Sequence, residues 1–386
     1  MSMFRPVHIC FFALLALGAV NSAQASTCEE VTRWPTDSWE DATEEAREKN
    51  ADVIAELEEL VFTLEGEDAE RIGTRTDAVV IIKSGRLIYE KYARGWNADK
   101  PHLTWSVTKS ITSALTGLAV SLGVLSLETS ICDYYADLPP DNCAVTVKHL
   151  LEFSTGFDWT EVYENEGNQV SSVFAMLYGE GREDMSTFVA NHPLRDEPGT
   201  TYQYSTGDAT LLTGILTKSL SDEYGDDFAW DLLFDPLGMT SSVIERDRAG
   251  GLIGGSYFYA TPRDLARFGY LYLNNGCWEN EQMLPEEWVT NSTSLTEVMS
   301  KERIDADPDW IQGWMWWLNI TDDDKGLEAP WPDLPATAFG ASGHWGQSIN
   351  VFPTLDMVVV RTADDRDRSF VKNDFLKLAV KIGEGL

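Results

Sequence analysis

Basic residues, cysteines and long hydrophobic runs are all scarce in this sequence. Lys and Arg number 29 against 63 Asp and Glu, so the formal net charge is −34. Such a charge repels nucleic acid and anionic membrane surfaces, and we expect neither as a partner. The acidic residues are spread along the chain, which is typical of a surface that aids solubility. An acidic groove for a cationic ligand is the alternative interpretation.

Metal-binding patterns are missing as well. The five cysteines form no C-x-x-C pair, no H-E-x-x-H occurs, and the five histidines are scattered. We therefore expect no metal ion and no cofactor. The sequence contains no internal repeat and no Ser/Gly linker, and its 43% hydrophobic and 24% charged residues are typical of a globular protein.

The first 25 residues have the pattern of a secretory signal peptide. Arg5 precedes an apolar run over residues 9–17, and the segment ends in Ala23-Gln24-Ala25. The run is too short to span a bilayer, which needs ~20 apolar residues. We expect cleavage after Ala25 and an exported product without a membrane anchor, in the periplasm or outside the cell. A retained N-terminal anchor is the alternative.

Export makes disulfide bonds the expected use of the cysteines. Cys10 leaves with the signal peptide, and the remaining four cysteines allow three connectivities. Cys132 and Cys143 flank a short polar loop, so we predict that they pair with each other. Cys28 and Cys277 then form the second bond by elimination.

Predicted strands near both ends of the chain enclose a mainly helical middle. This order favours an α/β (α+β) fold in one domain over residues 26–386. A lobe made of 26–104 and 251–386 would hold an inserted helical lobe over 105–250. Strands are expected at 77–83, 86–92, 314–320, 347–352 and 357–362, and further helices at 49–64, 263–275 and 370–382.

The motif Ser106-x-x-Lys109 is the first indication of chemistry. The two side chains lie one turn apart on the same face of a predicted helix. A serine needs a neighbouring base to become a nucleophile, and a lysine can be that base when burial lowers its pKa. The alternative is an N-cap serine with a solvated lysine, which is how we interpret a second copy, Ser369-x-x-Lys372.

Two further segments accompany this motif: 199–208, which contains Tyr204, and 339–347, which contains His344. With the three motifs in this order, the sequence resembles the serine β-lactamase-like superfamily from about residue 77 to 365. Its members include class C β-lactamases, D-alanyl-D-alanine carboxypeptidases, related esterases and 6-aminohexanoate-dimer hydrolases. The resemblance implies an antiparallel sheet flanked by helices, with an inserted, mainly helical lobe.

The resemblance also implies a role for each matching residue. Ser106 is the acylated nucleophile, Lys109 is its base or proton partner, and Tyr204 relays protons to the leaving group and the deacylating water. The backbone N–H groups of Ser106 and Gln347 form the oxyanion hole. The substrate-binding positions are Thr206, where the family usually has Asn, and the match to the family's Lys-Thr-Gly strand element, namely His344, Trp345 and Gly346.

Two departures from the family pattern narrow the expected substrate. Thr206 has a shorter side chain than the family's Asn, whose amide would hold a substrate carbonyl. His344 replaces a lysine that would bind a substrate carboxylate. We therefore expect an exported serine hydrolase that cleaves small ester or amide substrates through an acyl-enzyme. The alternatives are a D-amino-acid peptidase, carboxypeptidase or β-lactamase of the same superfamily, and a non-catalytic binding module on this fold.

Two long loops are expected to contribute aromatic residues near the site. Tyr163, Tyr178 and Trp331 are candidates for lining an acyl pocket, with ordinary loop packing as the alternative. Residues 164–168 mimic the spacing of a class A β-lactamase glutamate and asparagine. They precede the tyrosine motif, where the class A glutamate would follow it, so we interpret them as an acidic loop.

Overall fold

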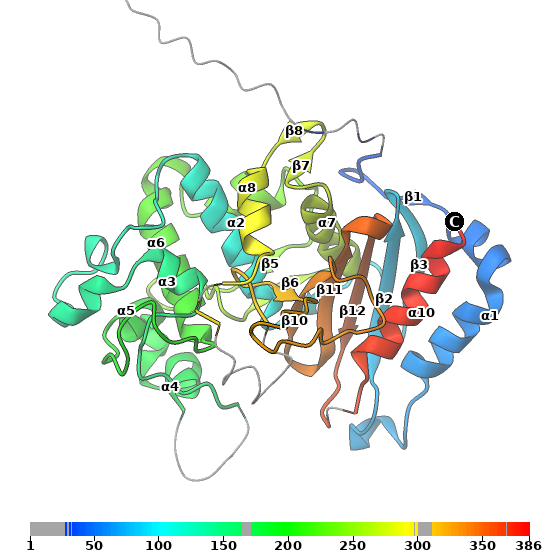
Figure 1. Cartoon of the computed structure of the whole chain (residues 1–386), viewed down its shortest axis with the longest axis horizontal. Coiled ribbons are helices and arrows are strands. Elements are labelled where there is room, and N and C mark those ends of the chain that lie inside the picture. Colours follow the sequence, from blue (N-terminus) through cyan, green and yellow to red (C-terminus); the bar gives the residue numbers. More distant parts are fainter. Residues whose placement is uncertain are drawn as a thin grey trace, which may run out of the picture.

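A computed structural model describes residues 28, 31, 33–163, 171–296, 298–299, 311–367 and 369–386. The described chain forms a central sheet with helices on both faces, and a group of helices to one side of it (Figure 1). The predicted signal peptide and the acidic loop at 164–168 lie outside the described residues.

The central sheet joins strands from both ends of the chain. Its order is β1-β3-β2-β12-β11-β10-β9, and β2 pairs with β12 along its full length. Neighbouring strands are antiparallel apart from β1, which pairs in parallel with β3, so the predicted antiparallel sheet is a mixed one. The strands are β1 Glu40–Asp41, β2 Thr76–Lys83, β3 Arg86–Tyr92, β9 Trp317–Leu318, β10 Phe339–Gly343, β11 Gln347–Phe352 and β12 Met357–Ala363.

Strand β2 shows why the sheet is covered on both faces. Val80 and Ile82 pack on the inner face, toward helices α2 (Val107–Ser121) and α7 (Pro262–Leu273). Val79 and Ile81 pack on the outer face, toward α1 (Thr43–Phe62) and α10 (Lys372–Glu384). A continuous run of apolar β-branched residues is typical of a strand buried on both sides.

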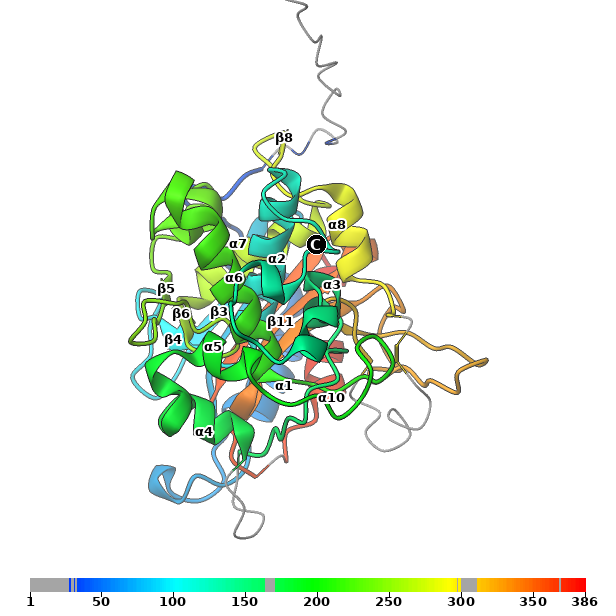
Figure 2. The same cartoon turned by 90° about the vertical axis from the view of Figure 1, so that its left-hand side faces the viewer.

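The helices beside the sheet gather around α6, which packs on α2, α3 and α5 (Figure 2). These helices are α3 Val147–Leu151, α4 Ser172–Tyr178, α5 Met185–Ala190 and α6 Thr206–Tyr224, and α8 Glu286–Ser292 lies outside the group. The small strands are β4 His102–Leu103, β5 Val243–Ile244, β6 Phe258–Ala260, β7 Cys277–Trp278 and β8 Glu281–Gln282. Short 3₁₀ or π segments are Asp68–Glu70, Ile131–Asp133, Pro140–Ala144, Glu180–Glu183, Trp230–Phe234, His344–Gly346 and Pro353–Leu355.

Two predicted elements have different bounds in the structure. The helix expected at 49–64 begins at Thr43, where Glu44 and Glu45 in the first turn favour the start of a helix. The strand expected at 314–320 is reduced to Trp317–Leu318. Met315 has a φ of 65°, and this left-handed conformation interrupts an extended strand.

Both disulfide bonds have the predicted connectivity. Cys132 is bonded to Cys143, and Cys28 is bonded to Cys277 across 249 residues of sequence. In the described part of the chain, no helix has the length and apolar composition that a membrane crossing requires.

Candidate active site

Ser106 stands at the start of the long buried helix α2, where its N–H lies at the positive end of the helix dipole. The preceding residue, Trp105, has a φ of 49°. A bulky side chain rarely adopts this conformation, so the surrounding structure must hold it. Ser106 itself is half-buried, which leaves its hydroxyl within reach of a substrate.

Lys109 lies one turn further along α2 and is buried at 2% exposure. Its Nζ donates to Ser106 Oγ at 3.0 Å, to Thr206 Oγ1 at 2.9 Å and to the carbonyl oxygen of Gly255 at 2.7 Å. Burial lowers the pKa of Lys109 from 10.5 to about 8, against the opposing charges of Glu161 and Asp208. The lysine can therefore lose its proton in mildly alkaline solution.

Tyr204 approaches the same two residues from the turn before α6. Its ring centroid lies 4.8 Å from Lys109 Nζ, and its phenol hydrogen-bonds with Ser106. Burial raises the pKa of Tyr204 far above its ordinary value, so the phenol stays protonated at neutral pH. The Tyr204 ring packs at a tilt against the ring of Phe153, with the centroids 5.1 Å apart, and this contact helps to fix it.

Thr206, the first residue of α6, does not face a substrate. It is fully buried, and its hydroxyl contacts Lys109 Nζ at 2.9 Å, Tyr163 Oη at 2.7 Å and the carboxylate of Glu161. The expectation that Thr206 binds substrate directly is therefore wrong, because its side chain is enclosed by protein. Thr206 instead connects Lys109 to the residues behind it.

The strand that passes Ser106 is β10, and it ends at Gly343. A Cβ atom on Gly343 would lie 2.1 Å from the carbonyl oxygen of Thr104 and 3.2 Å from Ser106 N, so glycine is needed for this close approach. His344, Trp345 and Gly346, expected on the strand, form a single 3₁₀ turn after it. That assignment was wrong, because the left-handed Trp345, at φ 60°, turns the chain away.

Gln347 begins β11, directly opposite Gly343. Its side chain is buried and braces the turn: Nε2 donates to the carbonyl oxygens of His344 and Ala363, and Oε1 accepts from the Ala363 N–H. These contacts account for Gln347 as a residue that holds the hairpin together.

Aromatic side chains surround Ser106. His344 stacks on Tyr163 with ring centroids 5.5 Å apart, and Trp105 packs against His344 and Trp345. Tyr178 is 53% exposed, and its hydroxyl hydrogen-bonds with that of Tyr257, which packs on Trp105. The structure thus brings Tyr163 and Tyr178 to the surroundings of Ser106.

Trp331 lies elsewhere. It is buried among the residues of the outer face, on the other side of the sheet from α2, and Lys372 Nζ lies 4.2 Å from its ring. The interpretation of Trp331 as a pocket residue is therefore wrong. Lys372 also donates to Ser342 on this face. Ser369 precedes the start of α10 by three residues and Val371 is the N-cap, so the interpretation of Ser369 as an N-cap is wrong and the second S-x-x-K motif does not form a helical pair.

Sequence reasoning missed two acids. Glu161 lies between Trp159 and Tyr163 and contacts both, and its negative charge acts on Lys109. Asp208 is buried in the first turn of α6, where burial raises its pKa to about 8. Glu161 belongs to no recognisable motif, and Asp208 ends the segment 199–208 without a predicted role. The contacts of both acids join segments that are far apart in the sequence.

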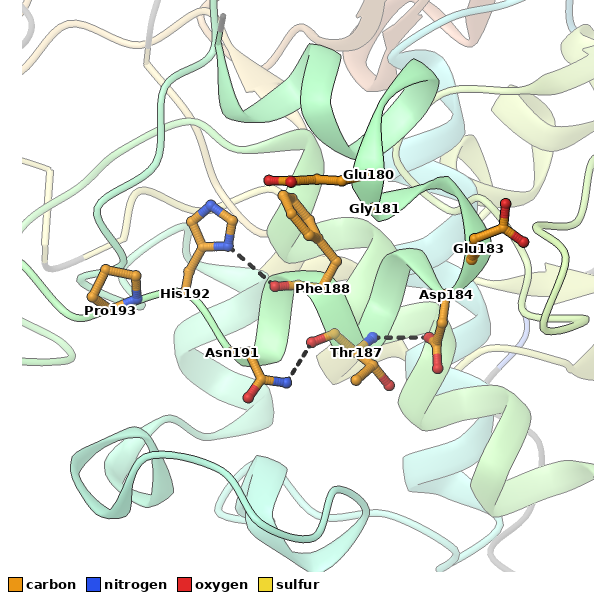
Figure 3. Close-up of a pocket in the computed structure, with 9 residues that line it drawn as sticks. All are labelled: Glu180, Gly181, Glu183, Asp184, Thr187, Phe188, Asn191, His192 and Pro193. Atoms are coloured by element: carbon orange, nitrogen blue, oxygen red, sulfur yellow. Dashed lines mark hydrogen bonds between the residues drawn. The ribbon is translucent and has the colours of Figure 1, made fainter.

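A groove of about 460 Å³ on the helical side carries acidic residues (Figure 3). Two of its three carboxylates have structural partners: Glu183 pairs with Arg248, and Asp184 accepts from the N–H of Thr187 at the start of α5. The groove is lined by Glu180, Gly181, Glu183, Asp184, Thr187, Phe188, Asn191, His192 and Pro193. Among the residues that the structure describes, no group of His, Cys, Asp and Glu could hold a metal ion.

Comparisons with known proteins show which sequences and folds this chain is similar to. The sequence model of the family described as Beta-lactamase matches residues 61–380. The 6-aminohexanoate-dimer hydrolase of Paenarthrobacter ureafaciens is 23% identical over 319 residues, which cover 81% of this chain and 78% of that protein.

Two solved structures have a similar fold. A class C β-lactamase has 16% identity and a TM-score of 0.59, with 89% of this chain and 97% of that chain covered. A penicillin-binding protein homologue from Caulobacter crescentus has 15% identity and a TM-score of 0.60, with 86% and 98% covered. At these identities the structural likeness shows the fold alone.

Proposed function

The chain belongs to the Beta-lactamase family, and on that basis we propose that it cleaves small ester or amide substrates through an acyl-enzyme on Ser106. One observation supports this proposal above all. A fully buried lysine, with its pKa lowered to about 8, places its Nζ 3.0 Å from the hydroxyl of a half-buried serine at a helix N-terminus. Such a pair is the arrangement of an activated nucleophile and its base.

In the first step, Ser106 Oγ attacks the substrate carbonyl while its proton passes to Lys109. Tyr204, in contact with both residues, hands a proton to the leaving group and later takes one from the water that hydrolyses the acyl-enzyme. The oxyanion needs two N–H donors, and each typically stabilises the transition state by ~2.7–4 kcal/mol. We assign them to Ser106 and to His344, the first residue after Gly343, in place of Gln347, for which the resemblance implies this role. The reason is that a Cβ atom on Gly343 would lie 3.2 Å from Ser106 N, so the end of β10 is the part of the strand beside the nucleophile.

We propose that the part of the substrate that lies along β10 carries no carboxylate or other negative charge. The strand residues that pass Ser106 are Ala341, Ser342 and Gly343, and none of the three is cationic. A lysine in the corresponding Lys-Thr-Gly element would hold a carboxylate, so a β-lactam lacks that partner here. The net charge of −34 disfavours anionic substrates further.

We also propose that the protein is exported, with residues 1–25 removed as a signal peptide. The two disulfide bonds support this, since such bonds persist in oxidising compartments. The N-terminal sequence of the mature protein, purified from the periplasm and from the medium, tests the cleavage after Ala25.

The nucleophile is tested by intact mass after reaction with a fluorophosphonate probe. We expect one adduct on the wild type and on Ser369→Ala, and none on Ser106→Ala. Ser369→Ala is the matched control because it removes the serine of the second S-x-x-K motif. A folded wild type that forms no adduct would contradict the hydrolase and favour a binding module.

The substrate class is tested with a panel of activated esters, linear amides including a 6-aminohexanoate dimer, a D-alanyl-D-alanine peptide and a β-lactam. Turnover of esters or linear amides is the expected result. Release of D-alanine would favour a carboxypeptidase, and β-lactam turnover at the rate of a dedicated class C enzyme would refute the proposed preference.

A further inference from the structure

The Glu161 carboxylate is the centre of a hydrogen-bond network that ends at Lys109. Its Oε2 accepts from Trp159 Nε1 at 2.6 Å and from the backbone N–H of Thr206 at 3.0 Å. Its Oε1 accepts from Tyr163 Oη at 2.9 Å and from the hydroxyl of Thr206. Both carboxylate oxygens are therefore held by donors from two separate segments of the chain.

The direction of the Thr206 hydroxyl proton determines what Lys109 can do. A carboxylate can only accept hydrogen bonds, so the single proton of Thr206 points at Glu161. Tyr163 Oη, 2.7 Å from Thr206 Oγ1, can then donate to one lone pair of that oxygen, which leaves the second for Lys109. This second lone pair is free to accept from Lys109 Nζ, 2.9 Å away. The other partner of Lys109, the carbonyl oxygen of Gly255 at 2.7 Å, is an acceptor in any state.

A lysine that acts as a base is neutral and carries two N–H bonds and one lone pair. Thr206 Oγ1 and Gly255 O accept the two N–H bonds. The lone pair is left to face Ser106 Oγ at 3.0 Å, where the proton to be removed lies. If Thr206 instead donated its proton to Lys109, that lone pair would already be used.

We propose that Glu161 is a positioning residue of the Ser106 site, which holds the Thr206 hydroxyl as an acceptor and so directs the lone pair of Lys109 at Ser106. This role rests on the proposed function, because Glu161 acts through Lys109. In the step concerned, the Ser106 O–H bond breaks as the Oγ–carbonyl bond forms. The proton moves to Lys109, and Tyr204 relays a proton from Lys109 to the departing group.

The charge of Glu161 has a second, separable effect. It raises the pKa of Lys109 against the effect of burial, as does the charge of Asp208 on α6. The ring of Tyr204 also faces the amine, 4.8 Å away. Asp208 accepts from Thr155 Oγ1, and its carboxyl group is not a partner of the Thr206 hydroxyl in these contacts, so it offers a control for the loss of a buried acid that does not hold Thr206.

The test compares Glu161→Gln with Asp208→Asn and the wild type, from pH 6 to pH 10 on an activated ester. Glu161→Gln should move the acid limb of kcat/KM to lower pH, since it removes a negative charge near Lys109. Asp208→Asn should move it less, because burial raises the pKa of Asp208 to about 8 and keeps this acid largely neutral at lower pH. Glu161→Gln should also lower the plateau of kcat roughly 10- to 100-fold, with little change in KM. This loss is a part of the ~10²–10⁴-fold rate enhancement that a positioned general base contributes. The plateau of Asp208→Asn should stay within about threefold of the wild type.

A second pair of variants, at Thr206, tests the same role if Glu161→Gln does not fold. Thr206→Ser retains the hydroxyl and should keep the plateau within about threefold, whereas Thr206→Val leaves one N–H of Lys109 without an acceptor and should lose roughly as much as Glu161→Gln. Circular dichroism establishes folding for each variant.

Different results would overturn the role of Glu161 and the proposed function of the protein. A Glu161→Gln plateau equal to that of the wild type, or equal rates for the two Thr206 variants, would overturn the role of Glu161 while Ser106 still forms its adduct. Absence of any adduct on the folded wild type would overturn the proposed function and this role with it.

Discussion

Replacing Lys109 by methionine measures two effects of this lysine: its contribution to catalysis, and the free energy that burying its charged amine costs the folded state. Lys109→Met keeps the apolar stem of the side chain and removes the amine. We expect kcat/KM to fall ~10²–10⁴-fold, which is the contribution typical of a positioned base. We also expect the stability of the variant, relative to the wild type, to depend on pH.

The size of that dependence follows from the pKa of Lys109, which burial lowers from 10.5 to about 8. Each pKa unit corresponds to about 1.4 kcal/mol, so the folded state bears a cost of about 3 kcal/mol at pH 7. Because the folded pKa lies below the unfolded one, the unfolded chain binds more protons between these values. The stability contributed by this group therefore rises from about pH 8 to pH 10.5. At pH 10 the cost has fallen to about 1 kcal/mol.

Urea unfolding at pH 7 and pH 10, with the disulfides intact, measures this effect. The free energy of unfolding of Lys109→Met, relative to that of the wild type, should be about 2 kcal/mol higher at pH 7 than at pH 10, because the wild type bears the larger burial cost at pH 7. The hydrogen bonds to Thr206 and Gly255 are lost at both pH values and cancel in the comparison. Lys377→Met, at a lysine side chain that is 52% exposed, is the control. An equal difference at both pH values would refute burial as the cause of the lowered pKa.

Three shorter predictions concern pH, the smaller disulfide and the strand beside the nucleophile. The kcat/KM of the wild type should rise with pH and level off above about 8, the pKa of Lys109, and a profile flat from pH 6 to 10 would contradict a lysine base. Replacing Cys132 and Cys143 by serine should lower the free energy of unfolding by about 3 kcal/mol in urea titrations, and an unchanged midpoint would contradict this value. Gly343→Ala places a methyl group 2.1 Å from a backbone oxygen and should lower activity at least about tenfold, whereas Gly251→Ala, with 3.4 Å to its nearest neighbour, should not.

The local features of the site could be predicted from the sequence. Ser106 and Lys109 are three residues apart on one helix, so helical geometry alone brings them together. Cys132 and Cys143 are only 11 residues apart, which favours their pairing over pairings with the more distant cysteines. Their pairing, like that of the two hairpin strands at 76–92, depends on neighbours in the chain.

The bounds of elements were less predictable where one residue changes the backbone conformation. His344, Trp345 and Gly346 matched a strand motif, yet the left-handed φ of Trp345 makes them a turn. Met315 shortens a strand in the same way. Hydrophobic patterns report which side chains are buried and carry no information on the sign of φ. The lobe boundaries at 105 and 250 stay predictions.

The sequence by itself therefore determined the Ser106-x-x-Lys109 motif, the Cys132–Cys143 bond and the order of strands and helices, because each depends on residues close together in the chain. The Cys28–Cys277 bond joins residues 249 positions apart and followed only by elimination. Tertiary structure alone decided that Thr206 faces Lys109, that Glu161 lies behind it, and that Trp331 is on the outer face of the sheet. Contacts of this kind join residues 45 to 97 positions apart. They arise from how the sheet and helices pack, and no local spacing encodes them.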